Sequence, residues 1–296
     1  MSIPSDDPRL EHWLCSSAPR EPVRVSLVGF AVDQGVVRNG GRAGASAGPQ
    51  AIRERLLRMC PDAADPAAFA RLLDHTRDLG NVEASGNLEA DQRTLGEVVA
   101  GELAQGTFVI VLGGGHETTY GHFLGYVGMG RAVAIQNIDA HADVRPLREG
   151  LGHSGSPFRQ ALEHPSGLCK SYRVEGLQPS AVAASHLEYL TERGGRYGFR
   201  RSFDPEGLYD SSCDMLATFC LDAVDQAFAP GVSAPSTDGL LPAEWLRAAY
   251  RAGACPGVLS ADVVELNPAF DRDGQTARLA ARTVWELLRG LASRAW

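Results

Sequence analysis

The sequence predicts an α/β protein with three layers, in which helices cover both faces of a mainly parallel sheet. Apolar runs such as residues 107–112 and 215–221 alternate along the chain with helical patterns, and continuous apolar runs are typical of strands buried on both faces. Strands that alternate with helices form parallel sheets with right-handed crossovers. Because no linker or repeat divides the 296 residues, we expect a single domain over residues 1–296, whose residues 1–22 form a lead-in segment.

The elements follow from composition and periodicity. Seven apolar or β-branched segments are predicted strands: residues 23–30, 74–82, 107–112, 132–135, 171–176, 215–221 and 257–264. Seven segments have helical patterns or a helix-starting proline: residues 51–59, 92–103, 118–127, 158–163, 180–192, 242–251 and 274–292. The glycine-rich residues 33–48 are a predicted loop, and residues 193–212 give no assignment.

Composition argues against several classes of protein. The formal net charge is -8 and no basic tract is present, so nucleic acid is not an expected partner. No run of about 18 apolar residues predicts a membrane span, and the polar N-terminus lacks the pattern of a signal peptide. The six cysteines are scattered, without a Cys-x-x-Cys pair, which is typical of free thiols in a reducing compartment. We therefore expect a cytoplasmic enzyme.

Three potential metal ligands follow the predicted strand 132–135 at alternate positions. In extended chain, Asp139, His141 and Asp143 point to one face, and they lie just beyond a strand end, where open α/β sheets place their sites. A capped strand end with a hydrogen-bonded histidine is the alternative. Three ligands at this spacing favour a metal site.

Two further strands end in ligands of the same kind. His116 follows three glycines after residues 107–112, and Asp222 follows residues 215–221. A carboxylate-rich set favours Mn²⁺ or a similar divalent ion over a closed zinc site. Five or six ligands are too many for one catalytic metal with an open position, so they indicate two metals about 3.5–4 Å apart.

Six sequence blocks resemble those of the ureohydrolase superfamily of arginase and agmatinase, and most closely its formimidoylglutamase branch. They are RNGGRAGASAGP (38–49), GGGHE (113–117), NIDAHADVR (137–145), SGSPFRQ (154–160), APGVSAP (229–235) and ELNPAFDRDGQTARLAA (265–281). The resemblance spans about residues 23–290. It implies an arginase-like three-layer α/β/α fold around a mainly parallel sheet of about eight strands, assembled as a homo-oligomer, a trimer or hexamer.

The resemblance also implies a ligand set. It assigns His116 and Asp143 to one Mn²⁺ and His141 and Asp222 to the other, with Asp139 bridging both. In this superfamily a sixth ligand, an aspartate, stands two residues before the position of Asp222.

This chain has Cys220 at that position. A thiolate could ligate and shift the site toward Zn²⁺ or Fe²⁺. A neutral thiol would leave one metal bound tightly and the other weak or absent. The centre could also be inactive. The loss of a bridging negative charge is expected to weaken metal binding.

The remaining candidates concern catalysis. Metal coordination lowers the pKa of a bound water to about 7, which supplies a nucleophile for the planar amidine carbon. The resemblance assigns Glu265 to pair with the amidinium through charge-assisted hydrogen bonds, and Asp143 is a further catalytic candidate. His153 is adjacent to the position of a proton-transfer histidine in arginase-like members, where this chain has Ser154. It is either a proton donor or a loop histidine.

A substrate that carries two carboxylates would need cationic or hydrogen-bonding side chains to bind them. We expect them among Ser154, Ser156 and three arginines, Arg38, Arg42 and Arg145; Glu265 is a substrate-binding candidate as well.

The first functional hypothesis is a metal-dependent hydrolase that cleaves a C–N bond of a linear amidine, N-formimidoyl-L-glutamate, to L-glutamate and formamide. The alternatives are a guanidino-compound hydrolase acting on arginine, hydroxyarginine, agmatine or a guanidino acid, and a metal-impaired homologue with a binding or regulatory role, because Cys220 replaces a ligand.

Overall fold

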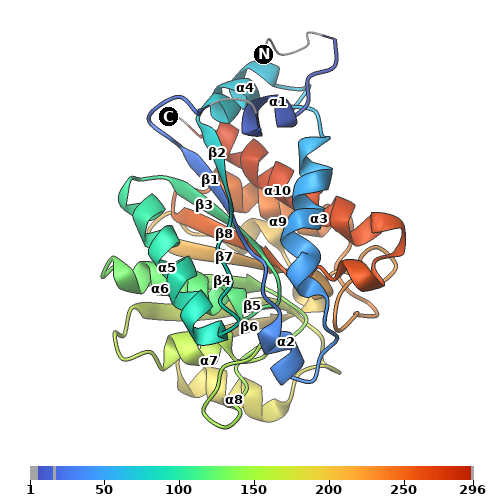
Figure 1. The fold of residues 1–296 in the computed structure, drawn as a ribbon. Helices are drawn as coiled ribbons and strands as arrows, with labels where there is room; N and C mark the ends of the chain where they lie inside the picture. The colour runs from blue at the N-terminus through green and yellow to red at the C-terminus, as the bar shows by residue number, and fades with distance from the viewer. Residues whose placement is uncertain (1–5, 16–17, 295–296) are drawn as a thin grey trace.

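Eight parallel strands form one sheet in the order β2-β1-β3-β8-β7-β4-β5-β6 (Figure 1). The structure is a computed structural model that describes residues 6–15 and 18–294. The strands are β1 (Val25–Phe30), β2 (Thr76–Asn81), β3 (Phe108–Gly113), β4 (Val133–Ile138), β5 (Cys169–Leu177), β6 (Arg196–Phe199), β7 (Met215–Cys220) and β8 (Val258–Val264). The sheet confirms the predicted fold class and the strand number that the resemblance implied.

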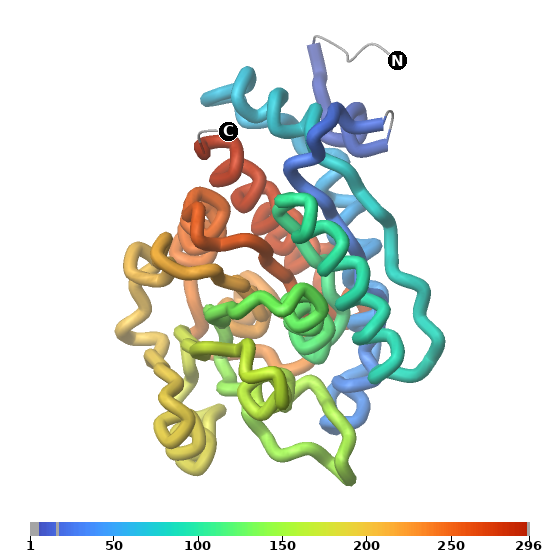
Figure 2. The backbone as a smooth tube through the Cα atoms, turned by 90° about the vertical axis from the view of Figure 1, so that its left-hand side faces the viewer, coloured from blue at the N-terminus to red at the C-terminus, as the bar shows by residue number. Residues whose placement is uncertain are grey.

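Helices pack on both faces of this sheet. They are α1 (Glu11–Leu14), α2 (Gln34–Arg38), α3 (Gly48–Leu57), α4 (Pro66–Asp74), α5 (Leu88–Ala104), α6 (Thr118–Gly128), α7 (Pro157–Leu162), α8 (Ala184–Glu192), α9 (Pro242–Ala254) and α10 (Gln275–Ala292). Short 3₁₀ turns, which include η3 (Pro205–Gly207) and η4 (Leu221–Ala223), complete the connections. Helices α5, α6 and α7 cover one face, and α3, α9 and α10 cover the other (Figure 1). Beside the edge strand β2 lie α1 and α4, and beside the edge strand β6 lies α8 (Figure 1, Figure 2).

Alternate residues of the strands feed two hydrophobic cores. In β3, Ile110 and Leu112 enter the core under α3, α9 and α10, whereas Val109 and Val111 enter the core under α5 and α6. This is the side-chain alternation of an extended chain, and it explains why β3 reads as a continuous apolar run.

Some predictions of the elements need correction. The loop predicted at residues 33–48 contains the short helix α2, and the unassigned residues 193–212 contain β6. The sequence reading also missed α4. The expected lead-in segment lies partly outside the described residues, and its described part contains α1.

The register of the central strands determines where the loops meet. Leu112 of β3 pairs with Val263 of β8, and Val264 of β8 pairs with Cys220 of β7. Phe219 of β7 in turn pairs with Ile138 of β4. The carboxyl ends of these four strands therefore lie side by side, and the loops that follow them share one edge of the sheet.

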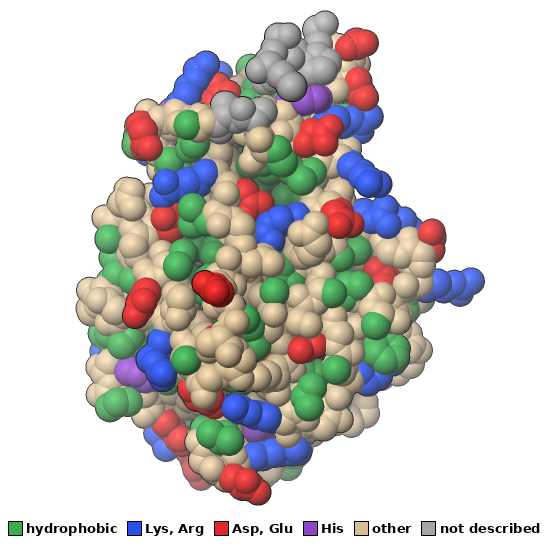
Figure 3. Space-filling view, in the orientation of Figure 1, with side chains coloured by type: hydrophobic (Ala, Val, Ile, Leu, Met, Phe, Trp, Pro, Cys, Tyr) green, Lys and Arg blue, Asp and Glu red, His purple; other side chains and the backbone are tan. Residues whose placement is uncertain are grey.

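The surface is polar and mixed in charge. On the face seen in Figure 3, basic and acidic side chains are intermingled. None of the helices in the described part of the chain combines the length and the apolar composition that a bilayer crossing requires.

Candidate metal centre

His116 forms one half of a buried cluster at the strand ends. Its side chain is fully buried, and its Nδ1 lies 3.1 Å from Oδ2 of Asp139 and 3.0 Å from Oδ2 of Asp143. Its Nε2 lies 3.1 Å from Oγ1 of Thr218 on β7, which orients the ring. Nδ1 nevertheless makes no hydrogen bond of normal geometry with any described residue. A buried polar atom in that state needs a partner, and the nearby carboxylates indicate a cation.

His141 forms the other half. Its Nδ1 lies 3.4 Å from Oδ1 of Asp139 and 3.2 Å from Oδ2 of Asp222. The second oxygen of Asp222, Oδ1, is buried without a hydrogen-bond partner in the described structure. Asp139 thus presents one carboxylate oxygen to each histidine, which is the arrangement of a bridging ligand.

Cys220, the last residue of β7, joins the first half. Its thiol is buried, and its sulfur, one His116 ring nitrogen and one Asp139 oxygen all lie within 4.8 Å of one another. A second group with the same spacing consists of Asp139, His141 and Asp222. The structure therefore brings five of the six expected ligands into two groups that share Asp139, and Asp143 adjoins the first group through its 3.0 Å approach to His116.

The electrostatics of the cluster favour cation binding. Burial would raise the pKa of Asp139, but His116 and His141 outweigh this effect and hold the pKa of that carboxyl below its usual range. Burial, reinforced by the Asp222 carboxylate, raises the pKa of Glu265 well above its ordinary value. Buried carboxyl groups outnumber the histidines here, so the donor set, with its unpaired Nδ1 and Oδ1 atoms, fits divalent metal ions.

Two residues of the site hold a strained backbone. Asp143 has φ 46° and Glu265 has φ 70°, a left-handed conformation that costs on the order of 1–3 kcal/mol in non-glycine residues. Glu265 is held there by its own hydrogen bonds: its N–H donates to Gly114 O (2.8 Å), and its Oε1 accepts the His116 backbone N–H (2.8 Å). Such strain is concentrated at functional sites.

A cavity of about 290 Å³ opens over the cluster. Its floor is formed by His141, Asp143, Cys220, Asp222 and Glu265. The rest of the lining comes from the loops after β1, β4 and β7, and its polar or charged residues are Asn39, Arg42, Arg145, Ser154 and Ser233. The cavity therefore offers carboxylates from the cluster together with cationic and hydrogen-bonding groups from the loops.

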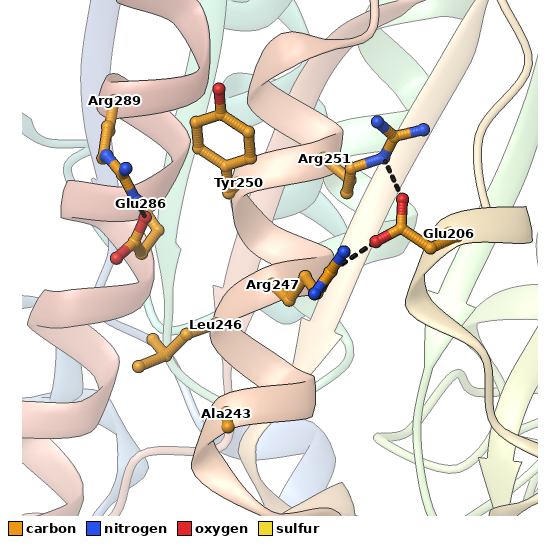
Figure 4. A pocket seen from close by; sticks show the side chains of 8 residues that line it. All are labelled: Glu206, Ala243, Leu246, Arg247, Tyr250, Arg251, Glu286 and Arg289. Atoms are coloured by element: carbon orange, nitrogen blue, oxygen red, sulfur yellow. Dashed lines mark hydrogen bonds and ion pairs between the residues drawn. The ribbon is translucent and has the colours of Figure 1, made fainter.

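A larger hollow of about 400 Å³ lies elsewhere, between η3, α9 and α10 (Figure 4). Its charged side chains pair with one another, because Glu206 binds both Arg247 and Arg251, and Glu286 binds Arg289. None of the predicted site residues lines it. The cavity at the strand ends is therefore the candidate active site.

Four of the predicted substrate-binding residues line this cavity: Glu265, described above, and Arg42, Arg145 and Ser154. The guanidinium of Arg145 forms no hydrogen bond or ion pair with any residue in the described ranges. Arg42 is held in place: its Nε donates to Ser233 O (3.0 Å) and its guanidinium lies 4.0 Å from the Phe270 ring centroid. Ser154 Oγ accepts a hydrogen bond from Asn39 Nδ2 (3.2 Å). Arg145 is thus the cation left for a ligand.

The structure does not bring Arg38 or Ser156 to the cavity, which corrects both predictions. Arg38 pairs with Glu89 and donates to Gly152 O (3.0 Å), so it braces two loops. Ser156 is fully buried, and its Oγ accepts the backbone N–H of His153 (2.9 Å).

The prediction of His153 as a proton donor is also corrected. Its Nδ1 accepts the Gly155 N–H (3.1 Å), so the proton lies on Nε2, 3.0 Å from Pro146 O. Both ring nitrogens are used within the loop, and the side chain does not line the cavity. His153 is a loop histidine, the alternative that the sequence left open.

Sequence reasoning missed two wall residues. Asn39 follows α2, and Ser233 lies in the APGVSAP block. Both belong to sequence blocks that carried the resemblance, so these segments were expected near the site. The sequence offered no reason to choose their uncharged side chains in addition to the arginines. The unpaired, buried Oδ1 of Asn39 marks it as a group with hydrogen-bonding capacity left over.

This fold and site place the chain in a known family. The model of the arginase family matches residues 23–289, and the chain belongs to that family.

Several relatives of similar sequence share one name. The chain is 41% identical over 288 residues to the formimidoylglutamase of Rhodococcus jostii (strain RHA1), covering 90% of this chain and 86% of the relative. It is similar in structure to Trypanosoma cruzi formiminoglutamase with Mn²⁺, with a TM-score of 0.87, 31% identity, and coverage of 98% and 100%. Arginase from Bacillus subtilis, at 24% identity and a TM-score of 0.74 over 90% of this chain and 98% of that one, shares the fold. The resemblance drawn from the sequence blocks is confirmed.

Proposed function

We propose that this protein hydrolyses N-formimidoyl-L-glutamate to L-glutamate and formamide with the help of two divalent metal ions. The observation that carries the proposal is the buried double cluster around Asp139, which lies beneath a cavity whose wall offers the unpaired cation Arg145. The relatives named formimidoylglutamase support the same substrate. They do not favour the guanidino substrates considered from the sequence.

The proposed ligands follow the two groups of the cluster. His116 and Asp143 would hold one ion and His141 and Asp222 the other, and Asp139, which lies against both histidines, would serve both. Manganese is the proposed metal, because the donor set is rich in carboxylates and the structure of the T. cruzi relative contains Mn²⁺. When bound, the ions supply Lewis acidity and a water that is nucleophilic at neutral pH.

The chain's own residues orient the substrate. The substrate carries a cationic amidinium at one end and carboxylates at the other, so it matches the anionic floor and the Arg145 wall. One oxygen of Glu265 is used by the His116 N–H, and the other is available for the amidinium. Arg145, with Ser154 and Asn39, is placed to bind carboxylate.

The reaction adds one water across the amidine. Its oxygen bonds to the formimidoyl carbon, the bond from that carbon to the glutamate nitrogen breaks, and this nitrogen takes a proton to leave as the amine of glutamate. Glu265, which lines the cavity and has one carboxylate oxygen free, is the group placed to hold the amidine N–H groups while this bond breaks.

Location and assembly remain proposals that the sequence supports. All six cysteines are free, as expected of a protein in the reducing cytoplasm. A homo-oligomer, a trimer or hexamer, is proposed from the resemblance alone.

A substrate panel tests the proposed function. Metal-loaded protein is assayed with N-formimidoyl-L-glutamate, arginine, hydroxyarginine, agmatine and guanidinobutyrate. We expect turnover of the first, with formamide as product. Faster turnover of a guanidino compound, with urea released, would overturn the choice of substrate, and no turnover of any of them would overturn the activity.

A further inference from the structure

Cys220 lies among charged groups, although it is a buried cysteine. Buried free cysteines usually behave as small apolar residues. Here the thiol lies close to the carboxyl groups of Asp139, Asp222 and Glu265, and it lines the cavity. Apolar packing does not explain this environment.

A second observation points to a ligand at the same place. His116 belongs to the group that contains Cys220 and Asp139, and its Nδ1 atom, which lies 3.1 Å from Asp139 Oδ2, is buried without a hydrogen-bond partner among the described residues. A cation bound by this group would satisfy the nitrogen and the sulfur together.

We propose that Cys220 binds metal through its sulfur, and that the centre is therefore chemically asymmetric. The group of His116, Asp139, Asp143 and Cys220 takes a softer divalent ion such as Zn²⁺, Fe²⁺ or Co²⁺. The group of Asp139, His141 and Asp222 takes a harder ion such as Mn²⁺. This inference rests on the proposed function because it concerns the same two-metal centre.

The asymmetry follows from ligand chemistry. Thiolates select soft and borderline ions, whereas carboxylate-rich sets suit Mn²⁺. The resemblance places a bridging aspartate at this position, but by ligand spacing the Cys220 sulfur groups only with His116 and Asp139, so the two groups have different preferences. On binding, the metal–sulfur bond forms, the S–H bond breaks, and the proton is released to solvent.

Absorption spectroscopy tests this directly. Metal-free protein is titrated with Co²⁺, whose bond to a thiolate gives a sulfur-to-cobalt charge-transfer band in the near ultraviolet. We expect the band in wild type and in Cys169→Ser, a control because Cys169 is a half-buried free thiol at the start of β5 that does not line the cavity. We expect it to be absent in Cys220→Ser and Cys220→Asp. Cobalt bound to wild type without the band, or a band that persists in Cys220→Ser, overturns the proposal.

Metal selection gives a second readout. With one equivalent of Zn²⁺ and a large excess of Mn²⁺, we expect elemental analysis to find about one of each in wild type, because Zn²⁺ in excess would fill both groups. Cys220→Asp is expected to bind Mn²⁺ more tightly than wild type. Changes to residues that only contact a metal ligand alter metal affinity by roughly 10- to 100-fold, so a change to a ligand itself should have at least this effect. Unchanged or weaker Mn²⁺ binding in Cys220→Asp counts against the inference.

A third measurement needs no variant. X-ray absorption at the zinc edge of Zn²⁺-loaded wild type is expected to contain a sulfur neighbour at about 2.3 Å, and nitrogen and oxygen neighbours alone would overturn the proposal. The two proposals fail differently. Sulfur ligation without hydrolysis of any substrate overturns the function only, and hydrolysis by a two-metal protein without sulfur ligation overturns this inference only.

Discussion

Replacing Arg145 by alanine tests how the cavity recognises the carboxylate end of its substrate. The guanidinium lines the cavity, and it makes no hydrogen bond or ion pair with the described residues. Its removal therefore breaks no internal polar contact of the described structure, so the free energy of unfolding is expected to stay close to that of wild type. The substitution should instead remove interactions with the substrate and so lower kcat/KM.

The magnitude follows from the contact that is lost. A hydrogen bond to a charged group contributes about 1.5–3 kcal/mol, and an arginine–carboxylate pair lies in the upper part of this range when it is bidentate. At about 1.4 kcal/mol per tenfold, kcat/KM for N-formimidoyl-L-glutamate should fall by about 10- to 150-fold.

The assay compares two substrates. Wild type and Arg145→Ala are measured with N-formimidoyl-L-glutamate and with an N-alkyl formamidine that lacks carboxylates, and only the first should lose kcat/KM. Arg148→Ala is the control, because Arg148 belongs to the same loop, is exposed and does not line the cavity. An equal loss on both substrates, or no loss on either, would refute the assignment of Arg145.

Three further predictions concern stability. Burial raises the pKa of Glu117 from 4.5 to about 7. Between these two pH values the folded protein therefore binds more protons than the unfolded protein. The free energy of unfolding should fall by up to about 3 kcal/mol as the pH rises from 4.5 to about 7. Urea unfolding of metal-free protein should show a weaker fall in Glu117→Gln, and identical pH profiles would contradict this. Thr283→Val leaves the buried indole N–H of Trp245, which donates to Thr283 Oγ1 at 2.7 Å, without its acceptor, and should cost about 1–3 kcal/mol; an unchanged unfolding midpoint would count against it. In Gly290→Ala the new Cβ would lie 2.2 Å from a backbone carbonyl oxygen of α9. Helices α9 and α10 must then move apart, at a cost of about 1–3 kcal/mol. An unshifted melting temperature would contradict this prediction.

The central strands were predictable because strands that are buried on both faces have continuous apolar sequences. Strands β3 and β7 are buried at every position, and this requires continuous apolar sequence. The edge strand β6, by contrast, has no fully buried residue, so its sequence RYGF carries no strand pattern. Helix α4 did carry a signal, since Asp65 caps it and proline begins it, and the sequence reading left that signal unused.

The metal ligands were predictable because their positions are determined by the ends of the strands that they follow. Ligands at alternate positions after β4 were expected to converge, and the sheet order then brings His116 and Asp222 to them. The contacts of Arg38 and His153 depend instead on how distant segments and loops meet: Arg38 binds the Glu89 side chain and Gly152 O, and His153 binds backbone groups of its own loop. No local pattern in the sequence encodes those contacts.

The most direct test of the account is to identify which C–N bond of the substrate breaks. The protein is loaded with metal, its metal content is verified, and it is incubated with N-formimidoyl-L-glutamate that carries ¹³C in the formimidoyl group. The account predicts labelled formamide and an equal amount of unlabelled glutamate in the NMR spectrum. Labelled N-formylglutamate with free ammonia, or unchanged substrate in the presence of two bound metals, would contradict it.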